Sequence, residues 1–282
     1  MRSYASSALS TARACFSLFR IKTAEGFQYR LAWISGATVG IFWALIEITV
    51  LAVFYNYAEN KEAGMMAGLT LKQVVTYVWV AQAVWTMQPM SIDSDILGKI
   101  NSGDVGIELC RPIDLYFHWF ARIAAGRLAP LFWRGSLTLL CGMLMPPAYR
   151  LSWPASLPSL LWTVVSLVCA FLLCTASGAF VTTVRLNIAW GDGPVYMFMF
   201  IGSILSGATL PLQLWPESWQ RFLLWQPFAG HMDIPIRLYI GSMQPGEAHG
   251  GVLLQVAWIL FFVVAGKLLM ARRLRTIVVQ GG

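Results

Sequence analysis

Long apolar runs separated by short polar stretches dominate the sequence. Six of these runs come near the roughly 20 residues that a helix needs to cross the hydrocarbon core of a bilayer. They are Leu31–Tyr55, Leu71–Ile92, Leu128–Met145, Leu157–Val184, Pro194–Leu210 and Val252–Met270. The pattern predicts an all-α integral membrane protein with six transmembrane helices.

Ahead of the first run, residues 1–30 show an amphipathic pattern. Apolar side chains recur there every three or four residues, opposite hydroxyl and arginine side chains, at Tyr4, Ala8, Ala12, Phe16 and Phe19. Because Arg13 and Arg20 interrupt any continuous apolar core, the segment is not a signal peptide. The pattern predicts a helix that lies in the membrane interface. A surface helix of a soluble domain is the alternative, but no soluble domain follows it.

The segment Pro211–Tyr239 precedes the last run and mixes prolines with tryptophans. Prolines at positions 211, 216 and 227 forbid one continuous helix. The tryptophans Trp215, Trp219 and Trp225 favour the boundary between lipid and water. Short helices that dip into the outer leaflet satisfy both constraints, and an external loop anchored by aromatic side chains is the alternative.

Composition and charge agree with a membrane protein. The chain is 57% hydrophobic and 12% charged, whereas soluble domains carry about 25% charged residues. The net charge of +7 would also suit nucleic-acid binding, but the basic residues lie at the ends of apolar runs instead of on one polar face. With the N-terminus inside, 14 of the 20 lysines and arginines are cytoplasmic and five are external. This bias predicts that both termini are cytoplasmic and that no nucleic acid is bound.

The sequence contains none of the common catalytic or metal-binding motifs. Gly98-Lys99-Ile100 lacks the first glycine and the hydroxyl of a phosphate-binding loop, and neither H-E-x-x-H nor G-x-S-x-G occurs. The five cysteines, at positions 15, 110, 141, 169 and 174, have no metal-ligand spacing. We therefore expect no enzymatic activity, no catalytic residue, no metal and no cofactor in this chain.

One cytoplasmic loop, Asp93–Arg127, is long enough to fold locally. Asp104 follows Gly103, where its carboxylate is expected to cap a short helix through Leu109. Pro112 is expected to end that helix. A short helix carrying both charged and apolar side chains suits a groove in a soluble partner, and a solvated loop without function is the alternative.

The run Ser102–Arg122 reads S-G-D-V-G-I-E-L-C-R-P-I-D-L-Y-F-H-W-F-A-R. It is similar to the S-G-D-L-x-x-x-L-x-R-P-x-D segment of a bacterial branch of the type 2 ABC exporter permeases. The order of an interfacial helix, two spans, a polar segment and four further spans also resembles that family. The resemblance implies that the segment is a coupling helix that contacts an ATP-binding subunit. The residues that it implicates are Gly103, Asp104, Glu108, Leu109, Arg111, Pro112 and Asp114.

The same resemblance implies the remaining architecture and the partners. It implies a type V exporter-like fold, with a re-entrant outer hairpin that places Trp215, Trp219 and Trp225 near an exit gate. The implied partners are a dimer of ATP-binding cassette ATPases, which binds ATP and Mg²⁺, and a second permease, identical or related. The implied location is the bacterial cytoplasmic membrane, with lipid around a multi-pass chain.

The chain is expected to form a single transmembrane domain, residues 1–282. Its expected parts are an interfacial helix (1–30), spans one and two (31–92), the coupling segment (93–127), spans three to five (128–210), the outer re-entrant segment (211–250), and the last span with a basic tail (251–282). Because six spans cannot easily enclose a wide pathway, two such units with twelve spans are expected in the working assembly.

Polar residues inside the spans are functional candidates, because ionisable groups are costly in lipid. Glu47 lies about 24 Å along the first run and Arg134 about 9 Å along the third, at ~1.5 Å per residue. This difference in depth predicts that the two do not pair. Lys72 or Gln82 is the expected partner of Glu47, and Arg134 can extend to the inner headgroups. A structural role and a substrate contact both remain open.

The sequence thus favours the permease subunit of an ATP-driven exporter. An apolar, aromatic interior suits a hydrophobic or amphipathic substrate, such as a lipid, a drug or a peptide. A secondary transporter or channel without an ATPase is the first alternative, although few carboxylates lie within the spans. A membrane-bound enzyme is the second, and it lacks a nucleophile with a supporting base.

Overall fold

The computed structural model describes residues 2–57, 65–66, 68–88, 92–110, 113–188 and 191–275. Nearly all of these residues are helical. The α-helices are α1 (Arg2–Gln28), α2 (Arg30–Tyr57), α3 (Leu71–Ala83), α4 (Ser94–Ser102), α5 (Val105–Leu109), α6 (Leu115–Leu144), α7 (Leu157–Asn187), α8 (Gly193–Leu205), α9 (Glu217–Trp225), α10 (Asp233–Ile240) and α11 (Ala248–Leu274). Three 3-10 helices are η1 (Trp85–Met87), η2 (Leu212–Leu214) and η3 (Pro227–His231). The strands β1 (Met65–Met66) and β2 (Leu69–Thr70) pair antiparallel.

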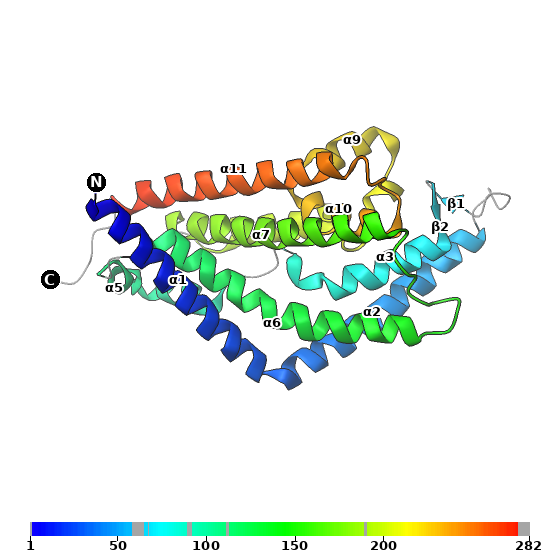
Figure 1. Cartoon of the computed structure of the whole chain (residues 1–282), viewed down its shortest axis with the longest axis horizontal. Coiled ribbons are helices and arrows are strands. Elements are labelled where there is room, and N and C mark those ends of the chain that lie inside the picture. The colour runs from blue at the N-terminus through cyan, green and yellow to red at the C-terminus, as the bar shows by residue number, and fades with distance from the viewer. Residues whose placement is uncertain are drawn as a thin grey trace.

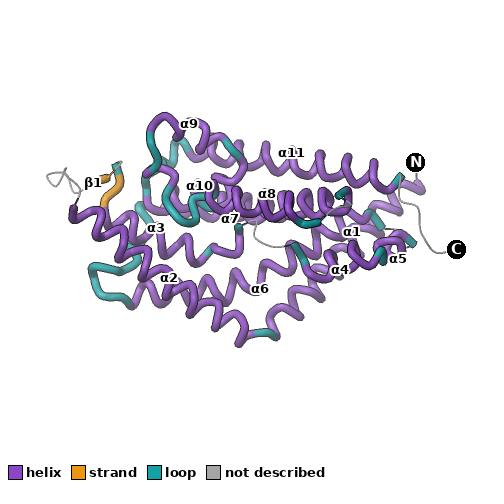
Figure 2. Tube along the Cα trace, turned by 180° about the vertical axis from the view of Figure 1, so that it is seen from behind, coloured by secondary structure: helices purple, strands orange, loops and turns teal. Residues whose placement is uncertain are grey.

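Three long helices, α6, α7 and α11, run along the length of the molecule (Figure 1). The helices α1 and α2 meet in a V at Tyr29, and both pack against α6. The helices α4 and α5 lie near the start of α1 and the end of α11, whereas α9, α10 and β1 lie at the opposite end (Figures 1 and 2). The expected cytoplasmic and outer segments therefore occupy opposite ends.

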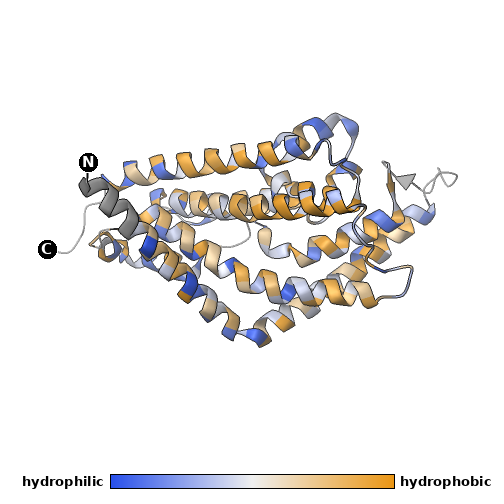
Figure 3. Cartoon of the chain, viewed as in Figure 1, coloured by the Kyte–Doolittle hydropathy of each residue, from blue (hydrophilic) through white to orange (hydrophobic). Residues whose placement is uncertain are grey.

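Hydrophobic residues cover the middle of α2, α7 and α11, and hydrophilic residues concentrate along α1 and near the helix ends (Figure 3). Among the described residues, these three helices are long and apolar enough to cross a membrane. They coincide with the first, fourth and last expected spans. The helix α8, at the fifth, has 13 residues and reaches about 20 Å, at ~1.5 Å per residue.

The second and third expected spans differ from the observed helices. Helix α3 ends at Ala83 instead of continuing to Ile92, and Gln88 is extended because the next residue, Pro89, disfavours helical backbone before it. Helix α6 begins at Leu115 instead of Leu128, capped by the Asp114 carboxylate. The predictions of one continuous helix over 71–92 and of a loop up to residue 127 are therefore wrong.

The core is centred on α3, in which every residue from Val74 to Ala83 is buried. The indole Nε1 of Trp79 donates to the Tyr149 carbonyl at 2.7 Å. The Tyr77 hydroxyl donates to the Gly207 carbonyl at 2.8 Å and to Asp233 Oδ1 at 3.0 Å. These bonds tie α3 to the segment before η2 and to α10.

The segment 211–250 folds into the short helices η2, α9, η3 and α10, as the prolines predicted. Helix α10 packs against α7 and α3, and most of its side chains are buried. The segment is therefore part of the packed structure rather than a loose loop. Its position as a re-entrant hairpin in a membrane stays a prediction.

Candidate functional site

The expected coupling segment begins with a well-capped helix. Asp93 Oδ1 accepts from the backbone amides of Asp95 and Ile96, both at 3.1 Å, and so satisfies two amides at the start of α4. Helix α4 ends at Ser102, and Gly103 follows it with a φ of 82°, in the left-handed region that glycine adopts without strain. The glycine reverses the chain between α4 and α5.

Asp104 occupies the position before α5, as predicted, but its side chain does not cap this helix. Its backbone is helical, with φ −68° and ψ −1°, instead of the extended form that directs a capping oxygen at the next amides. The carboxylate instead accepts from the Ser102 hydroxyl at 2.6 Å. The capping prediction is therefore wrong, although α5 ends at Leu109 as expected.

Glu108 is turned into the protein, with 7% of its surface exposed. Its carboxylate accepts from Lys99 Nζ at 2.5 Å and from Trp119 Nε1 at 2.9 Å. Burial alone would raise its pKa, but these two hydrogen bonds and the positive charge of Lys99 outweigh burial and lower the pKa. Glu108 thus joins α5 to α4 and α6 as a carboxylate.

Ion pairs and hydrogen bonds fasten the rest of the segment to three long helices. From α6, Arg122 Nε donates to Asp93 Oδ2 at 3.0 Å, and the same guanidinium pairs with Asp95. From α7, Arg185 donates to the side chain of Asn101 at 2.7 Å. From α11, Lys267 Nζ lies 3.1 Å from Asp114 Oδ2, which makes Asp114 both a cap and an ionic partner.

The segment presents a mixed surface to the outside. Val105 is buried with Ile96 against Trp119, so the apolar inner face is anchored. The outer face carries Asp104, Leu109 and Ile107, of which Ile107 is 65% exposed. Arg111 and Pro112 lie outside the described residues. This fixed, partly apolar surface is suited to docking.

Comparison with known families places the chain. A family model described as ABC-2 family transporter protein matches residues 41–281. The chain belongs to the ABC-2 transporter family. No match was found among curated proteins, and none among solved structures. As a permease of this family, the protein is the membrane component of an ABC transporter and is not itself catalytic.

Three polar residues within the helices of this ABC-2 permease, Glu47, Gln82 and Arg134, are linked by hydrogen bonds. Gln82 Nε2 donates to Glu47 Oε2 at 3.3 Å, and Arg134 Nη2 donates to Gln82 Oε1, also at 3.3 Å. Gln82 is the predicted partner of Glu47, whereas Lys72 is not bonded to it. Glu47 and Arg134 form no direct ion pair, as predicted, but the predicted difference in their depth is wrong because both bond to Gln82. Helix α6 begins 13 residues earlier than expected, so Arg134 lies about 29 Å along it, at ~1.5 Å per residue.

Arg134 is held inside the helix bundle. Its guanidinium carbon lies 5.7 Å from the ring centroid of Trp85. A Cβ placed on Gly40 would come 3.0 Å from Arg134 Nη2, so this glycine leaves the space that the guanidinium occupies. The alternative in which Arg134 extends to the headgroups does not fit this geometry.

The three outer tryptophans occupy different surroundings. Trp215 packs beside the buried Leu212 and Leu223. Trp219 is 55% exposed, and Trp225 is also exposed while its carbonyl accepts from Trp258 Nε1 at 3.0 Å. Trp215 therefore belongs to the packed interior of the outer segment, and the other two lie on its surface.

Several residues that hold these sites together escaped sequence analysis. Trp119 and Lys99 position Glu108. Arg122 pairs with Asp93, which caps the start of α4 and lies 29 residues earlier. Tyr77 and Asp233 join elements that are 156 residues apart. The sequence feature that could have predicted this bond was Asp233, an acidic residue in a strongly apolar stretch. A buried acidic side chain needs a hydrogen-bond or ionic partner.

Proposed function

We propose that this ABC-2 permease is the transmembrane subunit of an ATP-driven exporter, coupled to its motor through residues 93–114. The observation that supports the proposal most is the construction of the coupling segment. Its inner face is fixed to α6 by Glu108 and Asp93, to α7 by Asn101 and to α11 by Asp114. Ile107 and Leu109 stay exposed. A movement imposed on this surface is transmitted to the long helices instead of being absorbed by a flexible loop.

In this proposal, the motor is a dimer of ATP-binding cassette subunits, which binds ATP and Mg²⁺. A second permease, identical or related, completes the pathway in the bacterial cytoplasmic membrane. The basic residues support an orientation with α4, α5 and both termini in the cytoplasm. The segment 211–250 then faces outward, where Trp215, Trp219 and Trp225 contribute to an exit gate.

The proposed substrate is hydrophobic or amphipathic. Hydrophobic residues make up most of the long helices, and few charged residues lie among them (Figure 3). A pathway between these helices would have mostly apolar walls. Such walls suit a lipid, a hydrophobic drug or an amphipathic peptide better than an ion or a sugar.

Affinity purification of the tagged chain from its native membrane tests the proposal. We expect an ATP-binding subunit to co-purify in stoichiometric amount and to hydrolyse ATP in reconstituted vesicles. Transport that needs an ion gradient and no ATP, with no ATPase in the complex, would instead support a secondary transporter.

A further inference from the structure

Helix α8 is only lightly held by the rest of the molecule. Of its 13 residues, Val195, Met199 and Gly202 are buried. Its other face is open, with Met197 64% exposed and Phe200 67% exposed. The helix packs mainly against α7 and η3. A shift of α8 therefore breaks few packing contacts, in contrast to a shift of a helix in the core.

Arg185 joins the start of α8 to the coupling segment. Its Nε donates to the carboxylate of Asp192, the residue directly before α8. Its Nη1 donates to the carbonyl of Ile188 at 3.1 Å, and its Nη2 donates to Oδ1 of Asn101, on α4, at 2.7 Å. One guanidinium thus connects the end of α7, the start of α8 and α4.

The pair of Arg185 with Asp192 fixes the first turn of α8. An aspartate directly before a helix commonly caps it with its side chain, but the Asp192 side chain does not cap α8 and pairs with Arg185 instead. The Asp192 carbonyl accepts from the amide of Tyr196 at 3.0 Å, so a displacement of Asp192 displaces the helix. The Arg185 side chain is 11% exposed, and this partial burial makes the pair stronger than one on the open surface.

The other end of α8 is bonded to the outer segment and to α3. The carbonyl of Leu205, the last residue of α8, accepts from Gln226 Nε2 at 2.7 Å. The carbonyl of Gly207 accepts from the Tyr77 hydroxyl at 2.8 Å. Along the length of the molecule, α8 lies between α10 and the end that carries α4 and α5 (Figure 2). Helix α8 is therefore connected both to the coupling segment and to the outer segment.

We propose that α8 moves with the coupling segment and that Arg185 is the positioning residue that links the two. A movement of α4 displaces Asn101 and, through Arg185, the start of α8. Gly191 and Gly207 flank the helix with φ of 67° and 79°, and these glycine turns let it reorient. The bond at Leu205 carries the movement to the outer segment. This role of Arg185 rests on the proposed function, because the ATPase imposes the movement.

Asn101→Ala is the decisive variant, because it removes the bond between α4 and Arg185 and leaves the pair of Arg185 with Asp192 in place. The matched control is Asn187→Ala. The Asn187 side chain donates to the Thr183 carbonyl at 2.8 Å, within α7, so this variant loses a bond of the same kind that connects no two helices. Asn101→Asp keeps an acceptor oxygen for Arg185 and should restore the link.

Fluorine NMR of the complex with its ATPase measures the position of α8. The probe is a trifluoromethyl label on Met197→Cys, in a chain without native cysteines, because Met197 is exposed. Spectra are compared without nucleotide and with ATP, Mg²⁺ and vanadate. We expect the nucleotide to change the ratio of the probe signals about tenfold in the parent chain and in Asn187→Ala, but less than about twofold in Asn101→Ala. Asn101→Asp should recover the response.

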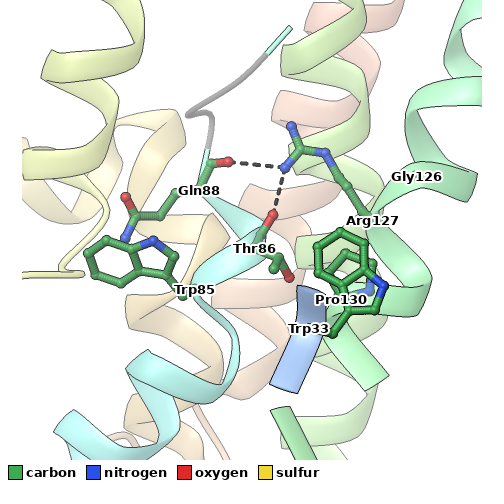
Figure 4. Close-up of a pocket in the computed structure, with 7 residues that line it drawn as sticks. All are labelled: Trp33, Trp85, Thr86, Gln88, Gly126, Arg127 and Pro130. Carbon is green, nitrogen blue, oxygen red and sulfur yellow. Dashed lines mark hydrogen bonds between the residues drawn. The ribbon is translucent and has the colours of Figure 1, made fainter. Parts of the chain in front are cut away.

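Arginine variants test the link from the other side. Arg185→Gln should lose the response, because a glutamine cannot reach all three partners. The control is Arg127→Gln. Arg127 also donates to backbone carbonyls, those of Thr86 at 2.6 Å and Gln88 at 3.1 Å, and these bonds join α6 to the region of η1 (Figure 4). Arg127→Gln should therefore keep the response.

A parental response in Asn101→Ala, or an equal loss in Asn101→Ala and Asn187→Ala, would overturn the role of Arg185. An equal loss in Arg185→Gln and Arg127→Gln would do the same, because it would reflect general destabilisation. Loss of the ATPase from Asn101→Ala would place Asn101 in the docking surface and overturn its assignment as the link. An active ATPase with an unresponsive α8 in the parent chain removes this inference alone, whereas the absence of an ATPase removes the proposed function and the inference with it.

Discussion

Replacing Glu108 is the sharpest perturbation of the coupling segment. The side chain accepts two hydrogen bonds, and Glu108→Ala leaves the Nε1 donor of Trp119 buried without an acceptor. An unsatisfied buried donor costs about 1–3 kcal/mol, and the lost bond to the partly exposed Lys99 adds no more than about 1 kcal/mol. We expect the opening free energy of α5 to fall by about 2–3 kcal/mol. Glu108→Gln keeps an acceptor oxygen for Trp119 and should cost about 1 kcal/mol.

Amide hydrogen exchange in residues 104–110 measures this opening directly. Glu108→Ala should accelerate exchange about 30- to 140-fold, the equivalent of 2–3 kcal/mol. The matched control is Asp104→Asn, because this neighbouring carboxylate is exposed and, among the described residues, its side chain bonds only to Ser102, within the same turn. Equal exchange in Glu108→Ala and Asp104→Asn would refute the argument that Glu108 fastens the segment.

The stability that Glu108 gives to α5 should fall at low pH. Because folding lowers the pKa of Glu108 below its ordinary value of 4.5, its stabilising contribution is fully present above that value. The contribution is lost as the pH falls through the lowered pKa. Exchange in α5 should therefore accelerate on acidification below about pH 4.5, and the acceleration should be much smaller in Glu108→Gln. An acceleration of the same size in that variant would contradict the assignment to Glu108.

Three further predictions concern other parts of the molecule. Gly40→Leu displaces the Arg134 guanidinium and should destabilise the protein by about 1–3 kcal/mol in thermal unfolding. Gly36→Leu is the control, because a Cβ at Gly36 meets open space. Equal stability of the two variants would count against the packing of Arg134. Trp215→Ala should lower export or cause a leak while the ATPase still co-purifies, and Trp219→Ala should affect stability less because Trp219 is exposed. Wild-type export without a leak in both variants would mean that the outer segment is only an anchor. In a chain free of native cysteines, an external thiol reagent should label a cysteine at Gly246 and not one at Ser102, and external labelling at Ser102 would reverse the orientation.

The sequence predicted those elements whose pattern is local. Helices α2, α7 and α11 coincide with uninterrupted apolar runs, and the prolines of 211–240 broke the outer segment as expected. The extended backbone of Gln88 also had a local cause, Pro89, which the apolar pattern concealed. The boundaries of these elements follow from side-chain polarity and backbone chemistry within a few residues.

The start of α6 could not be predicted in this way. Arg122 and Arg127 made the stretch before Leu128 look like a cytoplasmic loop. In the structure, Arg122 is paired with Asp93 and Asp95, and Arg127 bonds to carbonyls near η1, so the helix continues through both. The earlier start then brought Arg134 level with Gln82 and Glu47. The start of α6 and the position of Arg134 both depend on contacts between residues far apart in the sequence, and local periodicity carries no information about such contacts.

Site-specific cross-linking tests the coupling of this permease to an ATPase most directly. A photoreactive residue at Ile107 lies on the exposed face of α5. One at Gly246 lies between α10 and α11, and α10 is at the opposite end of the molecule from α5 (Figure 1). In the complex isolated from native membranes, illumination should join Ile107 to an ATP-binding subunit, and the position at Gly246 should give no such product. Absence of that product from Ile107, or equal yield from Gly246, would contradict the role of this surface as the coupling site.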